Sequence, residues 1–121
     1  MVRFAIGGHL EKLRIAEILK ETGGSEVAVE IMSDMGAAQA VKNGKADYYL
    51  GACNTGGGGA IAMAIAFLSI QACETISRSG KPSSYEDITA LVKAGKKAFG
   101  MTSEHVNILV PLIVKAILNN K

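Results

Sequence analysis

The chain has 121 residues, 49% of them hydrophobic, and a formal net charge of only +2. This length and composition predict one globular domain over residues 1–121 and exclude a disordered chain. Basic and acidic residues are interspersed, and three Tyr, three Phe and no Trp offer no platform for stacked bases, so we expect no nucleic-acid partner.

No segment of the sequence has the pattern of a membrane anchor. The first residues lack an apolar stretch followed by a cleavage site, and no apolar run reaches the roughly 20 residues of a bilayer span. We therefore expect a cytoplasmic protein with no membrane partner, in which Cys53 and Cys73 stay reduced. The two His and two Cys show no metal-ligand spacing, and Gly7-Gly8-His9 lacks the dinucleotide fingerprint, so we expect no metal and no cofactor.

Strand and helix patterns alternate five times along the chain. Apolar strands are predicted at residues 2–7, 27–32, 48–52, 73–77 and 97–101. Each is followed by a helix, predicted at 10–22, 34–43, 60–70, 83–94 and from 102 or 103 to 118. Gly23 and Gly24 stop the first helix, Asp34 N-caps the second, and Ser83 with Glu86 forms a capping box at the start of the fourth. Pro111 is expected to kink the last helix.

This alternation predicts an α/β fold of three layers, in which a five-stranded parallel sheet lies between helices on both faces. The commonest strand order for such a chain is 2-1-3-4-5, which puts the topological switch point between the first and third strands. Ligands of such sheets bind beyond the carboxyl ends of the strands at that point, so we expect His9 to face Cys53 there. His105 follows the strand predicted at the edge, two strand spacings or ~10 Å away, and is expected at the surface.

The segment after the third strand carries the strongest functional signal. It runs from Cys53 through Asn54, Thr55 and four successive glycines into an apolar helix. Glycines let backbone N–H groups approach an oxyanion, and the first turn of a helix adds a partial positive charge, which also favours the thiolate form of Cys53. We predict that this loop binds a small anion, with Cys53, Thr55 and His9 as the candidate catalytic residues. The candidate ligand-binding residues are Gly8, Asn54, Gly56, Gly57, Gly58, Gly59 and Arg78.

The string Cys53-Asn54-Thr55-Gly56-Gly57-Gly58-Gly59-Ala60-Ile61-Ala62 resembles the Cys-Gly-Thr-Gly-x-Gly-x-Ser-Ile-Ala turn of the type B ribose-5-phosphate and galactose-6-phosphate isomerases. Those enzymes are doubly wound domains with dimeric active sites. The resemblance implies that Cys53 is the base that moves a proton between C1 and C2, that Thr55 assists ring opening, and that glycine amides hold the enediolate oxygen. His9 is similar in place to the His of that family's Asp-His pair, but Gly8 stands where the family has Asp.

Over nearly its full length the chain is similar to a family of short bacterial proteins of unknown function that share an ADYY-G-AC-TGGGGA block, and that likeness implies no activity. Three functions stay open: binding of a small anionic, sugar-phosphate-like metabolite at Cys53–Gly59, an isomerase-like reaction with Cys53 as base, or a non-catalytic subunit or interaction role. The shortage of acid-base residues favours binding. In structural terms, Cys53 can be a packed hydrophobe, Thr55 a helix cap and His9 a surface residue.

The helix predicted at 60–70 has apolar side chains on all sides, with Ser69 as its one polar residue. Such a helix has no face suited to water, and its length of ~16 Å is too short for a ~30 Å hydrocarbon core. We therefore predict a homo-oligomer that packs this helix against its mate and brings each glycine loop near the partner chain, where a residue such as His105 could complete the neighbouring site.

Overall fold

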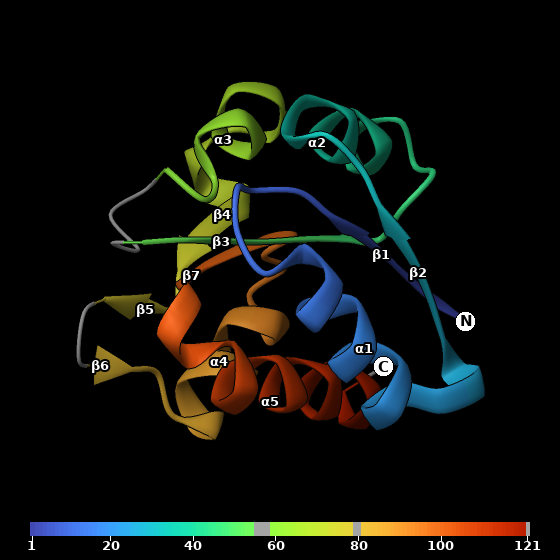
Figure 1. Ribbon diagram of the computed structural model, residues 1–121, viewed down its shortest axis with the longest axis vertical. Coiled ribbons are helices and arrows are strands. Elements are labelled where there is room, and N and C mark those ends of the chain that lie inside the picture. Colours follow the sequence, from blue (N-terminus) through green and yellow to red (C-terminus); the bar gives the residue numbers. More distant parts are fainter. Residues whose placement is uncertain (55–58, 79–80, 121) are drawn as a thin grey trace.

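The computed structural model of the chain describes residues 1–54, 59–78 and 81–120. The predicted site residues Thr55, Gly56, Gly57 and Gly58 lie outside the described residues. The predicted fold class is confirmed, because a five-stranded parallel sheet lies between two layers of helices (Figure 1).

The elements follow the predicted alternation of strand and helix. The strands of the sheet are β1 (Val2–Ile6), β2 (Val27–Ile31), β3 (Tyr48–Cys53), β4 (Cys73–Thr75) and β7 (Ala98–Thr102). The helices are α1 (Lys12–Gly23), α2 (Asp34–Lys42), α3 (Ala62–Leu68), α4 (Tyr85–Lys93) and α5 (Val106–Asn119). The remaining elements are the hairpin strands β5 (Ser77–Arg78) and β6 (Lys81–Pro82) and the 3-10 turns η1 (Gly24–Glu26), η2 (Ile70–Ala72) and η3 (Ser103–His105).

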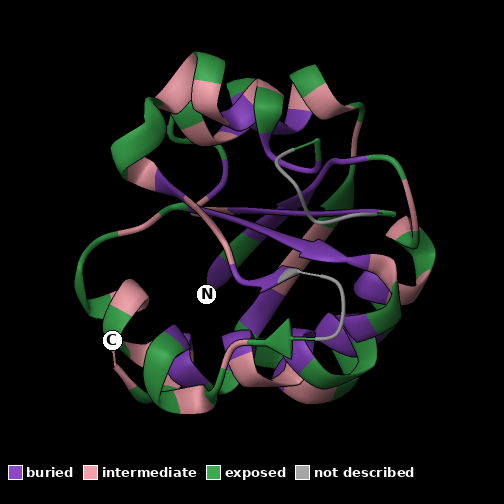
Figure 2. Ribbon diagram, turned by 90° about the vertical axis from the view of Figure 1, so that its left-hand side faces the viewer, coloured by how far each residue is buried: buried purple, intermediate pink, exposed green. Residues whose placement is uncertain are grey.

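Helices α2 and α3 cover one face of the sheet, and α1, α4 and α5 cover the other (Figure 1). Side chains alternate along β3, so Leu50 and Ala52 join the core under α1 and α5, whereas Tyr49 joins the core under α2 and α3. Figure 2 shows the buried strands enclosed between helices whose outer faces are exposed. The alternation of side chains along each strand therefore determines which residues at the carboxyl edge face α2 and α3 and which face α1, α4 and α5.

The strand order differs from the prediction. It is β2-β1-β3-β7-β4, so the last strand in the chain lies beside β3 and not at the edge. All five residues of β7 are buried and uncharged, whereas β4 has three residues and contains Glu74. A strand that is apolar on both faces suits the middle of a parallel sheet, and a short polar strand tolerates the edge. This order makes Thr102 the register partner of Cys53, so His105 follows a strand that lies beside the third strand.

A pair of glycines in neighbouring strands lets the end of the glycine loop lie directly on the sheet. Gly51 and Gly100 are register partners in β3 and β7. A Cβ on Gly51 would stand 2.5 Å from the carbonyl oxygen of Ala60, and one on Gly100 would stand 2.7 Å from Cγ2 of Ile61. Both Ala60 and Ile61 are buried. This close approach holds the far end of the loop against the strand that carries Cys53.

Helix ends lie within two residues of the predictions, except that α5 begins at Val106, three or four residues later than predicted. The second and fourth helices are capped by Ser33 and Ser84, not by Asp34 and Ser83, and each serine side chain accepts a backbone N–H of the first turn. The helix predicted at 60–70 is reduced to α3, which ends before Ser69, a residue with a φ of 86°. Because α3 has only seven residues, its dipole contributes less to the loop than the sequence suggests.

The loop predicted after the fourth strand is an antiparallel hairpin, β5–β6, in which Arg78 pairs with Lys81. Strand β4 ends at Thr75, earlier than predicted. Helix α5 continues through Pro111 to Asn119. The hairpin lies on the same side of the molecule as the carboxyl ends of β3 and β7 (Figure 1).

Candidate functional site

The loop after β1 lies against the end of β3. The amides of His9 and Leu10 both donate to the carbonyl oxygen of Ala52, at 3.1 and 3.2 Å. Gly8 has a φ of +73°, and a Cβ at this position would stand 2.8 Å from the amide nitrogen of Ala52, so the turn requires glycine. The loop carrying His9 therefore contacts β3 one residue before Cys53, at the switch point between β1 and β3.

A buried tyrosine joins this loop to the end of the glycine loop. The hydroxyl of Tyr49 donates to the carboxylate of Asp34 and lies 2.7 Å from the carbonyl oxygen of Ala60. The same carboxylate accepts the Gly8 amide at 3.2 Å. Burial, and then the hydrogen bond to Asp34, raises the pKa of Tyr49 well above its ordinary value, so the hydroxyl keeps its proton. Tyr49 thus connects the loop after β1, the first turn of α2 and the segment that carries Ala60.

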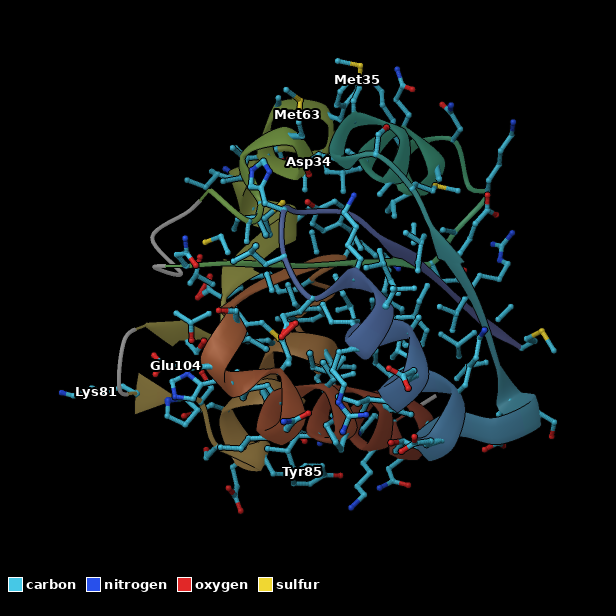
Figure 3. The ribbon with its side chains drawn as sticks, viewed as in Figure 1. Asp34, Met35, Met63, Lys81, Tyr85 and Glu104 are labelled. Atoms are coloured by element: carbon cyan, nitrogen blue, oxygen red, sulfur yellow. The ribbon has the colours of Figure 1, made fainter. Side chains whose placement is uncertain are left out.

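His9 and Asp34 form an outer pair at this edge. Nε2 of His9 lies 4.0 Å from Oδ2 of Asp34, and the imidazole is 63% exposed whereas the carboxylate is 19% exposed. Figure 3 shows Asp34 on the side of the sheet that α2 and α3 cover. Because Tyr49 and Gly8 hold Oδ1, Oδ2 is left to orient the imidazole. The sequence predicts His9 as a site residue, but it suggests only a capping role for Asp34.

Three small polar side chains line up across the ends of neighbouring strands. Cys53 is the register partner of Thr102, and the amide of Thr102 donates to Oγ of Ser77 at 2.8 Å. All three residues are buried. The predicted strand order separates Thr102 from Cys53, so this row of a thiol and two hydroxyls is a consequence of placing β7 beside β3.

His105 extends this row. Its Nδ1 lies 2.8 Å from Oγ1 of Thr102, which lies 3.1 Å from Oγ of Ser77. The residue is only 8% exposed, so the expectation of a surface histidine is wrong. The η3 turn brings residues three apart in the chain onto the same side, and this returns the imidazole to the end of β7.

The remaining predicted residues lie around the same edge. Asn54 is exposed directly after β3, and an ideal Cβ on Gly59 would stand 3.9 Å from Sγ of Cys53. Arg78 lies in β5 on the nearby hairpin. Cys73, in contrast, is a core residue at the start of β4, and burial raises the pKa of its thiol.

Two lysines add positive charge near this edge. Nζ of Lys12 donates to the carbonyl oxygen of Met32, beyond the end of β2, at 2.6 Å. Lys81 is exposed on β6, and Figure 3 shows Lys81 and Glu104 at the hairpin. Within the described ranges, no three His, Cys, Asp or Glu side chains are grouped so that they could hold a metal ion. The helices of the described chain are too short or too polar to cross a bilayer.

Comparison with known proteins places the chain in a family. Residues 2–117 match the model of the family described as protein of unknown function DUF2620. The chain is 37% identical over 114 residues to the proteins described as uncharacterized protein YhfU from Escherichia coli K12 and from Shigella flexneri, with 94% of this chain and 97% of each relative covered. No solved structure gives a significant match. The chain therefore belongs to the DUF2620 family of proteins of unknown function, in agreement with its full-length resemblance to short bacterial proteins of that kind.

Proposed function

We propose that the protein binds a small anionic, sugar-phosphate-like metabolite at the carboxyl edge of the sheet, over the segment from Cys53 to Gly59. The observation that carries this proposal is the contact between the loop after β1 and the end of β3. Open parallel sheets bind their ligands at this switch point. The glycine-rich segment begins there, and its backbone N–H groups suit the oxygens of an anion.

The described side chains at this edge also suit a ligand with both anionic and hydroxyl groups. His9, Lys12 and Lys81 offer donors, two of them cationic, for a phosphate or carboxylate. Asp34 and Asn54 offer acceptors for sugar hydroxyls. This mixture favours a phosphorylated, sugar-like compound over an inorganic anion alone.

A thermal-shift screen of sugar phosphates, nucleotides and organic acids tests the proposal. A ligand at 100 times its Kd stabilises the folded state by roughly 2.7 kcal/mol, so binding is visible without any assay of turnover. We expect at least one sugar phosphate to raise the Tm of the parent protein. Gly57→Val and Gly58→Val should keep the Tm of the unliganded protein and lose the shift. Variants that bind every compound as well as the parent does would assign the glycines a purely structural role.

An isomerase-like enzyme is the second candidate, and the row of Cys53, Thr102 and His105 favours it. In that reaction the thiolate of Cys53 takes the proton from C2 of an aldose phosphate and returns it to C1, while the proton of the C2 hydroxyl moves to the C1 oxygen. Incubation with ribose 5-phosphate or galactose 6-phosphate in D2O would introduce deuterium into the sugar, and Cys53→Ser should abolish the exchange. Ligand binding without exchange in the parent protein would restrict the function to binding.

An interaction role is the third candidate, and the apolar surface of the α2–α3 layer favours it. Met35 is 48% exposed and Ile70 is 66% exposed, and Figure 3 shows Met35 and Met63 at the outer margin of this layer. We infer that a second copy of the chain covers this surface, which would bring the two carboxyl edges near each other.

Light scattering at micromolar concentration tests this inference. The parent protein should have at least twice the chain mass of 12.6 kDa. Met35→Glu and Ile70→Glu should shift the protein to the monomer, because they bury a charge in the interface. Leu13→Glu is the matched control, since Leu13 is 75% exposed on α1 at the opposite face. A monomeric parent, or an equal effect of all three variants, would contradict the inference.

A further inference from the structure

Ser77, Thr102 and His105 form a chain of hydrogen bonds at the end of β7. The Thr102 amide donates to Oγ of Ser77 at 2.8 Å, Oγ of Ser77 lies 3.1 Å from Oγ1 of Thr102, and Oγ1 of Thr102 lies 2.8 Å from Nδ1 of His105. The three residues are 2%, 0% and 8% exposed. At this burial the hydroxyl hydrogens of Ser77 and Thr102 need partners within the protein.

The positions of the hydroxyl hydrogens follow from this requirement. Oγ of Ser77 already accepts a hydrogen bond from the Thr102 amide. Among the described residues, the acceptor within reach of the Ser77 hydroxyl hydrogen is Oγ1 of Thr102. If Ser77 donates to Thr102, the Thr102 hydroxyl donates to Nδ1 of His105. The reverse direction would leave the buried Ser77 hydroxyl hydrogen without a partner in the described chain, which is unfavourable. The hydrogen bonds are therefore donated in the direction from Ser77 through Thr102 to His105.

This direction assigns the tautomer of the imidazole. Because Nδ1 accepts, the ring hydrogen is on Nε2, and Nε2 forms no hydrogen bond with the described residues. The ring is more than nine-tenths buried, and Thr102, to which it is bonded, is the register partner of Cys53. An imidazole fixed in this way has one donor left for a ligand.

We propose that His105 is a neutral hydrogen-bond donor of the anion site, whose Nε2–H binds an oxygen of the ligand beside Cys53. This inference rests on the proposed function and assigns one side chain to the oxyanion. Ser77 and Thr102 are then positioning residues, because they act through His105 and need not contact the ligand. A neutral donor of this kind binds phosphate or carboxylate oxygens without a change in its own charge.

The tautomer is tested by nitrogen-15 NMR of the histidine side chains. The chain has two histidines, so His9→Gln identifies the signals of His105. We expect Nδ1 without a hydrogen and Nε2 with one at neutral pH, and we expect Thr102→Val to remove this preference. Thr89→Val is the matched control, because Oγ1 of Thr89 is buried and has no hydrogen-bond partner among the described residues. A hydrogen on Nδ1 of the parent protein would overturn the inference while leaving the proposed function intact.

Binding of inorganic phosphate tests the contact with the ligand. The side-chain amide nitrogen of Gln can occupy the place of Nε2, whereas that of Asn corresponds to Nδ1. His105→Gln should therefore retain phosphate binding to within a few-fold, and His105→Asn should weaken it by about ten- to a hundredfold, as expected for loss of a hydrogen bond to a charged group. Equal affinities of both variants and the parent would overturn the contact. A parent protein that binds neither phosphate nor any sugar phosphate would overturn the proposed function as well.

Discussion

Replacement of Tyr49 by Phe removes the hydroxyl that connects two loops and the first turn of α2 at the carboxyl edge. Tyr49 is fully buried, and its hydroxyl bonds the Asp34 carboxylate and contacts the carbonyl oxygen of Ala60. The phenyl ring of Tyr49→Phe still fills the space of the tyrosine ring. The variant therefore loses one hydrogen bond to a charged group and leaves the Asp34 carboxylate and the Ala60 carbonyl oxygen without this partner. Such a loss costs about 2 kcal/mol, which corresponds to a Tm decrease of about 5–10 °C for a chain of this size.

Urea and thermal unfolding of Tyr49→Phe and Tyr48→Phe measure this effect. Tyr48 is the neighbouring residue in the same strand, half-buried, and its hydroxyl forms no hydrogen bond with the described residues. We expect Tyr48→Phe to change the free energy of unfolding by less than about 0.5 kcal/mol. Amide signals of Gly8 and Ala60 should shift in Tyr49→Phe alone. Equal losses in the two variants would refute the assignment of Tyr49 as the residue that joins these loops.

Three further predictions concern the same edge. The raised pKa of Tyr49 means that the folded state keeps a proton that the unfolded state releases, so stability should be complete below about pH 10 and decline above it, less steeply in Tyr49→Phe. Gly51→Ala should cost about 1–3 kcal/mol in urea unfolding because its Cβ would stand 2.5 Å from the carbonyl oxygen of Ala60, whereas Gly59→Ala, with its nearest contact at 3.9 Å, should be nearly neutral. Iodoacetamide near neutral pH should label Cys53 faster than Cys73, whose thiol has a raised pKa through burial, and equal slow labelling of the two single-cysteine variants would remove the case for Cys53 as base or nucleophile.

The fold class could be predicted because its signals are local. Helix stops such as Gly23, the apolar strands and the alternation of the two patterns are each contained within a few residues. The strand order depends on which strand is buried on both faces, and this signal was also in the sequence. The strand at 98–102 has no charge, whereas the one at 73–75 contains Glu74. The commonest topology for such a chain nevertheless places the fourth strand, and not the fifth, beside the third.

The positions of the candidate site residues could be predicted where they depend on the chain's own turns, and could not be predicted where they depend on tertiary contacts. Gly8 and His9 are found at the switch point because the loop after β1 must pass the end of β3. The sequence suggests Asp34 as a helix cap, but Ser33 caps the helix in the structure, and the carboxylate of Asp34 accepts the hydroxyl of Tyr49. A signal for this contact was available, because the hydroxyl of a tyrosine in a buried strand needs a hydrogen-bond partner. His105 could be identified only once β7 was placed beside β3.

Titration of the nitrogen-15-labelled protein with ribose 5-phosphate, followed through its backbone amide signals, tests whether the carboxyl edge of the sheet binds a phosphorylated metabolite. We expect saturable shifts concentrated at residues 8–9, 53–59 and 102–105, which include or follow in the sequence the carboxyl ends of β1, β3 and β7. Glucose, which lacks the phosphate, should leave these signals in place. Shifts confined to the opposite edge of the sheet, or no shifts with ribose 5-phosphate or any other sugar phosphate at millimolar concentration, would contradict the claim that this edge binds a phosphorylated metabolite.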